Sequence, residues 1–179
     1  MNLPNFLTAL RIILAPVSVM FLFLDIPHTE LYAAGIFILA GLTDGLDGYA
    51  ARIRREITAF GKSFDPLADK ILVLFALLSL MKLGLVAWWV VAIIILREVF
   101  VTILRWFAGR AGLSVGASSL GKIKTFTQIL AIPALILKLP IANILLYIAV
   151  FFTILSGAQY AILWGGALSR KAAEKKQAA

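Results

Sequence analysis

Residues 44–69 read DGLDGYAARIRREITAFGKSFDPLAD, a run in which two pairs of aspartates stand on either side of a basic connection. Long apolar stretches precede and follow this run, approximately at 31–51 and 65–83. A helix that spans a bilayer needs about 20 predominantly apolar residues. The run therefore predicts two membrane helices that are joined by a positively charged loop and carry carboxylates at their adjoining ends.

The composition of the whole chain also indicates a membrane protein. Its 179 residues are 62% hydrophobic and 15% charged, and the mean hydropathy is +0.99. Soluble domains are typically about 45–50% apolar and about 25% charged. One small core could not remove this much apolar surface from water, whereas a bilayer can. We expect an all-α, polytopic integral membrane protein in which residues 1–179 form a single domain.

Six apolar stretches predict six transmembrane helices. Their approximate ranges are 6–24, 31–51, 65–83, 85–106, 121–137 and 141–168. The first, third and fifth connections contain only two basic residues, Lys82 and Lys138, whereas the other two connections and the C-terminal tail are rich in Lys and Arg. Because basic loops tend to stay on the cytoplasmic side, we expect a multi-pass protein of the cell membrane with both termini in the cytoplasm.

Residue usage excludes several kinds of site. The chain has no cysteine, which excludes disulfides, thiol catalysis and cysteine-ligated metals. Its one histidine, His28, lies in a polar turn, so we expect neither a histidine catalyst nor a histidine metal site. The formal net charge of +8 is explained in a membrane protein by the basic cytoplasmic loops, and we expect no nucleic-acid partner.

The two aspartate pairs predict a metal site that faces the cytoplasm. Asp44 and Asp47 are three residues apart, and Asp65 and Asp69 are four apart, so each pair shares one face of its helix. Ionisable residues within spans are costly and usually functional. Four converging carboxylates would repel one another, and Mg²⁺, Mn²⁺ or Ca²⁺ would neutralise them, of which we expect Mg²⁺ or Mn²⁺. Two such ions would leave positions for phosphate oxygens.

Structural roles remain open for the same residues. Asp65 stands directly before a proline and could simply cap the start of a helix. Asp44 and Asp47 could form buried salt bridges with Arg52 or Lys70. The glycines near these acids could serve only to let helices pack closely.

The run at 44–69 closely resembles the signature of the CDP-alcohol phosphatidyltransferases. That signature is Asp, two residues, Asp-Gly, two residues, Ala-Arg, eight residues, Gly, three residues, Asp, three residues, Asp, and every spacing matches. The matching positions are Asp44, Asp47, Gly48, Ala51, Arg52, Gly61, Asp65 and Asp69. The resemblance implies a membrane transferase that moves a phosphatidyl group from a CDP-activated lipid to an alcohol and releases CMP.

The resemblance also implies a role for each matching residue. One metal ion would be bound by Asp44, Asp47 and Asp65. A second would be bound by Asp44, Asp65 and Asp69, and Asp69 would be the general base on the attacking hydroxyl. The CDP portion of the lipid would contact Gly48, Arg52, Thr58 and Gly61. The family resemblance further suggests a homodimer.

Looser resemblances point to one branch of this family, the bacterial phosphatidylglycerophosphate synthases. They lie at residues 2–5, at the Arg-Glu pair 97–98 with Arg105, and along 117–128. One departure is Trp106, where that branch usually has an acid. This branch implies CDP-diacylglycerol and glycerol-3-phosphate as the substrates.

Basic residues in the second half of the chain support a phosphate-bearing acceptor. Glycerol-3-phosphate is a dianion at neutral pH and needs cations beside the metal site. Arg97 and Arg105 are eight residues apart, about two helical turns, and so share a face. We predict an acceptor phosphate site formed by Arg97, Arg105, Arg110, Lys122 and Lys124. The two lysines could instead anchor the protein at the membrane surface, and Arg97 could pair with Glu98.

Three other functions compete with this one. A CDP-alcohol-type cardiolipin synthase would use phosphatidylglycerol as the acceptor. A divalent-cation or proton-coupled transporter would need charges distributed through the depth of the bilayer, whereas the acids here gather at one side. A lipid-binding scaffold would not require four carboxylates of the kind that bind metals.

Overall fold

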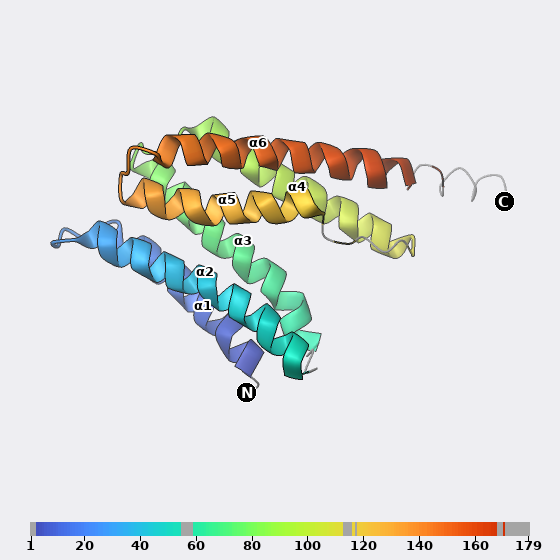
Figure 1. The fold of residues 1–179 in the computed structure, drawn as a ribbon, viewed down its shortest axis with the longest axis horizontal. Coiled ribbons are helices and arrows are strands. Elements are labelled where there is room, and N and C mark those ends of the chain that lie inside the picture. The colour runs from blue at the N-terminus through green and yellow to red at the C-terminus, as the bar shows by residue number, and fades with distance from the viewer. Residues whose placement is uncertain (1–2, 55–58, 113–115, 117, 168–169, 171–179) are drawn as a thin grey trace.

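The computed structural model (Figure 1) is entirely helical over the residues it describes. The backbone is described for residues 3–54, 59–112, 116, 118–167 and 170, and the side chains for residues 6, 9–43, 70–112, 116, 118–167 and 170. The helices are α1 (Leu3–Phe21), α2 (Thr29–Arg54), α3 (Ala59–Lys82), α4 (Trp88–Arg110), α5 (Ser119–Ile136) and α6 (Ala142–Tyr160), and α6 continues as the π-helical turn η1 (Ala161–Gly165). The all-α prediction is therefore confirmed for this part of the chain.

Two helical hairpins, a diagonal helix and the helix α4 form the bundle. In Figure 1, α1 and α2 make one hairpin, α5 and α6 make the other, and α3 crosses diagonally between them. The strongest packing is within each hairpin, and α1 also packs on α3 and α4 on α6. The turns after α1, α3 and α5 all lie at one end of the bundle.

Large apolar side chains and small residues share the core. Phe37 and Ile94 are fully buried, and Ala33 and Ala40 on α2 let neighbouring helices approach closely. The Ser18 hydroxyl donates a buried hydrogen bond of 2.9 Å to the carbonyl of Ala33 and so joins α1 to α2. The core therefore combines close helix packing with a local polar contact, as is usual where lipid surrounds a bundle.

Apolar side chains also cover much of the outside of the bundle. Ile13, Leu96, Phe151 and Ile162 are each at least half exposed. Exposed apolar surface on this scale is typical of a face that meets lipid. By length and composition, one helix within the described residues can cross a bilayer, namely Ala142–Gly165 with 24 residues.

Several helices are longer than their apolar stretches. The prediction placed the start of the third helix at residue 65, but α3 begins at Ala59. Asp65 is therefore inside α3 and does not cap it, and Gly61 is helical, not part of a loop. The reason is that backbone hydrogen bonding does not stop where the side chains become polar. In the opposite sense, the regular part of α6 ends at Tyr160 because its backbone changes to a π-helical turn, although the apolar stretch runs to 168.

A left-handed glycine ends α3. Gly84 has φ of +74°, and the N–H groups of Gly84 and Leu85 bond to the carbonyls of Met81 and Leu80. This is the 5→2 and 6→1 pattern of a Schellman motif, in which glycine avoids a steric cost that other residues meet.

We expect Gly84→Ala to lower the free energy of unfolding by about 1 kcal/mol, because an L residue is strained at this φ. Thermal unfolding in detergent would measure the change. Gly35→Ala is the matched control, since Gly35 lies within α2 and a Cβ there would have open space. A Gly84→Ala protein as stable as the Gly35→Ala protein would contradict this explanation of the turn.

Candidate active site

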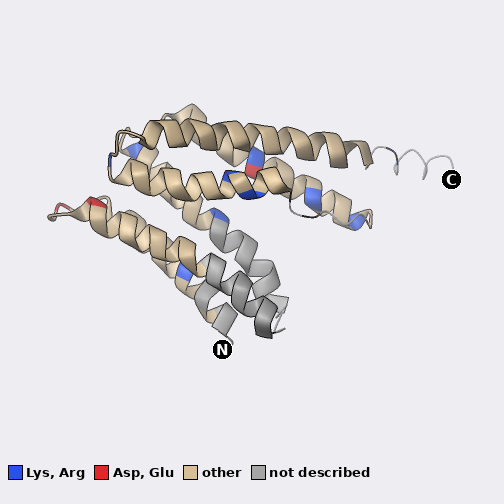
Figure 2. Ribbon diagram, viewed as in Figure 1, with Lys and Arg blue, Asp and Glu red and all other residues tan. Residues whose placement is uncertain are grey.

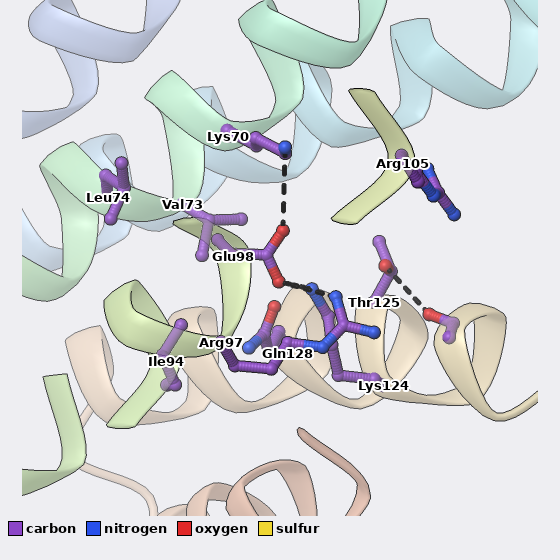
Figure 3. Close-up of a pocket in the computed structure, with 11 residues that line it drawn as sticks. Lys70, Val73, Leu74, Ile94, Arg97, Glu98, Arg105, Lys124, Thr125 and Gln128 are labelled. Carbon is purple, nitrogen blue, oxygen red and sulfur yellow. Dashed lines mark hydrogen bonds and ion pairs between the residues drawn. The ribbon is translucent and has the colours of Figure 1, made fainter. Parts of the chain in front are cut away.

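A cavity of about 190 Å³ lies between α3, α4 and α5 (Figure 3). Apolar side chains form one wall, and charged or amide side chains form the other. Its polar lining consists of Lys70, Arg97, Glu98, Arg105, Lys124, Thr125 and Gln128. Four basic groups against one acidic group give the described lining a formal net charge of +3. Figure 2 shows how unusual this is, because most of the described ribbon carries no charge.

Glu98 organises the basic groups from three helices. Its Oε1 accepts hydrogen bonds from Arg97 Nη1 at 2.9 Å and from Lys124 Nζ at 2.6 Å, and its Oε2 lies 4.0 Å from Lys70 Nζ. The side chains of Arg97, Glu98 and Lys124 are only 8–15% exposed. Buried charges are stable only when paired and hydrogen-bonded. Glu98 thus holds cations of α3, α4 and α5 around one space.

Arg97 and Arg105 lie on the same face of α4, as their spacing predicts, and both approach Tyr160 of α6. The Tyr160 ring centre is 5.8 Å from Arg97 Cζ and 5.0 Å from Arg105 Cζ. Arg105 Nη2 donates to the Tyr160 hydroxyl at 2.5 Å, and Arg97 Nη2 donates to Ser156 Oγ at 2.9 Å. The buried Nε of Arg97 has no hydrogen-bond partner among the described residues.

The start of α5 sets the position of the remaining polar side chains. Ser118 is the N-cap, and its Oγ accepts a hydrogen bond of 3.0 Å from the N–H of Gly121. Lys124 and Gln128, which are four residues apart, then face the cavity together. Gln128 Nε2 donates to Thr153 Oγ1 of α6 at 3.4 Å. The cap thus fixes where α5 begins, and the helical repeat then sets the positions of both side chains.

The structure separates the predicted acceptor-site residues into two groups. Arg97, Arg105 and Lys124 line the cavity. Arg110 lies over the Trp106 ring at 3.9 Å, and Lys122 is exposed, so neither belongs to the lining. Helical geometry explains both cases, because residues two or five apart point to opposite sides of a helix with 3.6 residues per turn.

Sequence reasoning did not assign Lys70 or Tyr160 to the site. The sequence suggests Lys70 only as a salt-bridge partner for aspartates. In the structure its side chain lines the cavity, and its ammonium donates to Thr102 Oγ1. A lysine within an apolar helix was the available signal. Tyr160 gave no such signal, since aromatic residues are common in membrane helices.

The predicted metal and CDP residues have side chains outside the described residues. They are Asp44, Asp47, Asp65 and Asp69 for metal and Gly48, Arg52, Thr58 and Gly61 for CDP. The backbone places the first aspartate pair near the end of α2 and the second pair in the first half of α3. The chemistry of the donor set fits Mg²⁺ or Mn²⁺, which prefer carboxylate oxygens. Asp69 directly precedes Lys70, whose side chain lines the cavity.

The cavity is suited to binding a phosphate group. Two guanidinium groups and two ammonium groups provide charge-assisted donors, and apolar walls strengthen each interaction by excluding water. One carboxylate reduces the mutual repulsion of the cations without cancelling their charge. The arrangement favours a small dianion over a neutral ligand.

Comparison with known proteins gives a consistent result. The family model for CDP-alcohol phosphatidyltransferases matches residues 1–155. A Bacillus subtilis protein named CDP-diacylglycerol–glycerol-3-phosphate 3-phosphatidyltransferase is 42% identical over 179 aligned positions, which cover 89% of this chain and 93% of the relative. A Rickettsia bellii protein of the same name is 39% identical, with coverage of 89% and 93%. A probable phosphatidylglycerophosphate synthase of Mycobacterium tuberculosis is 40% identical, with coverage of 89% and 79%. The chain belongs to the CDP-alcohol phosphatidyltransferase family.

Proposed function

We propose that the protein is a CDP-diacylglycerol–glycerol-3-phosphate 3-phosphatidyltransferase, an enzyme of phospholipid biosynthesis. The observation that carries this function is the cationic cavity of Lys70, Arg97, Arg105 and Lys124, found in a family member whose relatives bear that name. The hydroxyl oxygen of glycerol-3-phosphate forms a bond to the phosphorus of the phosphatidyl group. The bond from that phosphorus to CMP breaks, and the products are phosphatidylglycerol phosphate, CMP and the proton of the hydroxyl.

The aspartates of the signature serve the reacting end of the substrates. Asp44, Asp47, Asp65 and Asp69 would hold a pair of Mg²⁺ or Mn²⁺ ions, because the four carboxylates would otherwise repel one another. When bound, such ions would neutralise the pyrophosphate and stabilise the leaving CMP. Asp69 accepts the proton of the attacking hydroxyl. The CDP portion is held by Gly48, Arg52, Thr58 and Gly61.

The cavity binds the phosphate of glycerol-3-phosphate. Arg97 and Arg105 supply forked donors, and Lys70 and Lys124 add compact positive charges. Because Lys70 follows Asp69 in α3, the acceptor's phosphate would be bound next to the segment that carries the base. A substrate that is bound at its phosphate in this way has its free hydroxyl held at a fixed distance from that phosphate.

The proposed topology has six spans, with both termini and the active site on the cytoplasmic side of the cell membrane. Its support is the arrangement of the turns, because the three connections with few basic residues lie at one end of the bundle (Figure 1). Lys138 of one such connection pairs with Glu30 at the start of α2, at 3.0 Å. A single domain over 1–179 and a homodimer complete the proposal.

The acceptor alcohol is tested directly by an assay with two acceptors. Purified protein with CDP-diacylglycerol and Mg²⁺ should form product with glycerol-3-phosphate and not with phosphatidylglycerol, because a monoester dianion suits a cavity of charge +3 better than a diester monoanion. EDTA should abolish turnover, and added Mg²⁺ or Mn²⁺ should restore it. Product formed only with phosphatidylglycerol would replace the proposed enzyme by a cardiolipin synthase.

A transporter built on the same acids has less support. Glu98 is the one acid of the predicted spans whose side chain lies within the described part of the chain, and it is already bound by basic groups from three helices. An acid held in this way is poorly suited to relaying ions through the bilayer. The enzyme therefore explains the described charges better than the transporter does.

A further inference from the structure

One face of α6 contacts both cavity arginines without lining the cavity itself. This face consists of Ser156, Gly157 and Tyr160, which are all buried. Ser156 bonds to Arg97 and Tyr160 bonds to Arg105, and α4 and α6 pack on each other. Arg97 is therefore held between Glu98 and Ser156 of α6, and Arg105 is held by Tyr160 of α6.

Tyr160 uses its whole hydrogen-bonding capacity around Arg105. Its hydroxyl accepts from Arg105 Nη2 at 2.5 Å and from the N–H of Ser118 at 3.0 Å, and donates to the carbonyl of Gly116 at 3.0 Å. A phenol hydroxyl has one donor and two acceptor positions, so none is left over. The side chain is also 99% buried within the bundle, since Tyr160 is only 1% exposed. Arg105 is thus tied to α6 and to the segment before α5 at one point.

Gly157 provides the surface on which the stem of Arg97 rests. A Cβ at position 157 would lie 3.2 Å from Arg97 Cγ, which is closer than ordinary van der Waals contact. The neighbouring Ser156 Oγ accepts from Arg97 Nη2 at 2.9 Å and donates to the carbonyl of Thr153 at 3.0 Å. The glycine therefore permits the approach, and the serine fixes the end of the guanidinium.

We propose that this face of α6 positions Arg97 and Arg105 for the phosphate of the acceptor alcohol. Long side chains lose much rotamer freedom when they become ordered around a ligand. Here α6 orders both guanidinium groups in the free protein. The side chains therefore lose this conformational entropy when the protein folds and not when the ligand binds. Tyr160, Gly157 and Ser156 are positioning residues, which set the affinity for the acceptor through the arginines. The inference rests on the proposed function.

Tyr160→Phe tests the hydroxyl while keeping the ring beneath both arginines. We expect KM for glycerol-3-phosphate to rise about tenfold, because Arg105 loses a charge-assisted hydrogen bond. We expect kcat to change by less than about twofold and KM for CDP-diacylglycerol to stay constant. Tyr147→Phe is the matched control on the same helix, since Tyr147 is 56% exposed and stacks on Trp89 far from the cavity.

Gly157→Ala tests the same face independently. The added methyl should push the stem of Arg97 aside by a few tenths of an ångström and raise KM for glycerol-3-phosphate a few-fold. Gly165→Ala is its control, because a Cβ at Gly165 has open space. Unchanged acceptor KM in both Tyr160→Phe and Gly157→Ala, or an equal rise in the KM of both substrates, would overturn the inference.

A binding measurement separates this inference from the proposed function. Inorganic phosphate in EDTA should raise the unfolding temperature of the wild-type protein, and should raise that of Tyr160→Phe less. If the wild type does not use glycerol-3-phosphate but phosphate still distinguishes the two proteins, the proposed acceptor is wrong and the positioning role stands. If the wild type turns over and phosphate stabilises both proteins equally, the positioning role is wrong and the proposed function stands.

Discussion

Asp69→Asn should reduce turnover by about 10²–10⁴-fold while CDP-diacylglycerol still binds. The substitution keeps the size and the hydrogen-bonding shape of the side chain but removes the basic oxygen that accepts the proton of the attacking hydroxyl. A base contributes to the transition state and little to the ground state, so the loss should appear in kcat. Turnover with glycerol-3-phosphate and the dissociation constant for labelled CDP-diacylglycerol, measured on the same protein, would separate the two effects.

The matched control for this prediction is Asp25→Asn. Asp25 is exposed in the turn between α1 and α2, at the end of the bundle that carries Glu30 and Lys138. Its substitution should leave both turnover and lipid binding unchanged. Asp69→Asn protein that retained activity would remove Asp69 as the base, and loss of lipid binding together with turnover would make it a metal ligand first.

The helical class and the shared face of Arg97 and Arg105 were predictable, because both depend on local patterns. Aspartates three or four residues apart, and arginines eight apart, define helix faces without any knowledge of tertiary structure. The same arithmetic would have removed Arg110 and Lys122 from the site, since each points away from its cavity-lining neighbour. Helix ends were less predictable, because α3 and α4 continue into polar residues that no longer signal a span.

The support around the arginines could not be predicted from local patterns. Tyr160 reaches Arg105 across 55 residues of sequence and the Gly116 carbonyl across 44. Gly157 is distinguished only by Arg97 lying against it. Contacts of this kind depend on how α6 packs on α4. The angle and register at which two helices cross cannot be read from a single sequence.

Arg97→Ala should raise KM for glycerol-3-phosphate by about 10²-fold or more and leave the binding of CDP-diacylglycerol nearly unchanged. Truncating one partner of a buried, hydrogen-bonded charge pair costs about 2–5 kcal/mol, or roughly 30-fold to several thousand-fold. Arg97 contributes in two ways, since its side chain lines the cavity and its Nη1 bonds to Glu98. Arg110→Ala is the matched control, because that arginine stacks on Trp106 outside the cavity.

The replacement Arg97→Lys distinguishes charge from geometry at the same position. Lysine keeps the positive charge beside Glu98, but it has one nitrogen in place of the separate Nη1 and Nη2 that reach Glu98 and Ser156 in Arg97. We therefore expect an acceptor KM between those of the wild type and Arg97→Ala. If Arg97→Lys were equal to wild type, net charge alone would select the acceptor. If Arg97→Ala weakened the binding of both substrates equally, Arg97 would belong to the metal and CDP end of the site. The acceptor would then be selected by Arg105, Lys70 and Lys124.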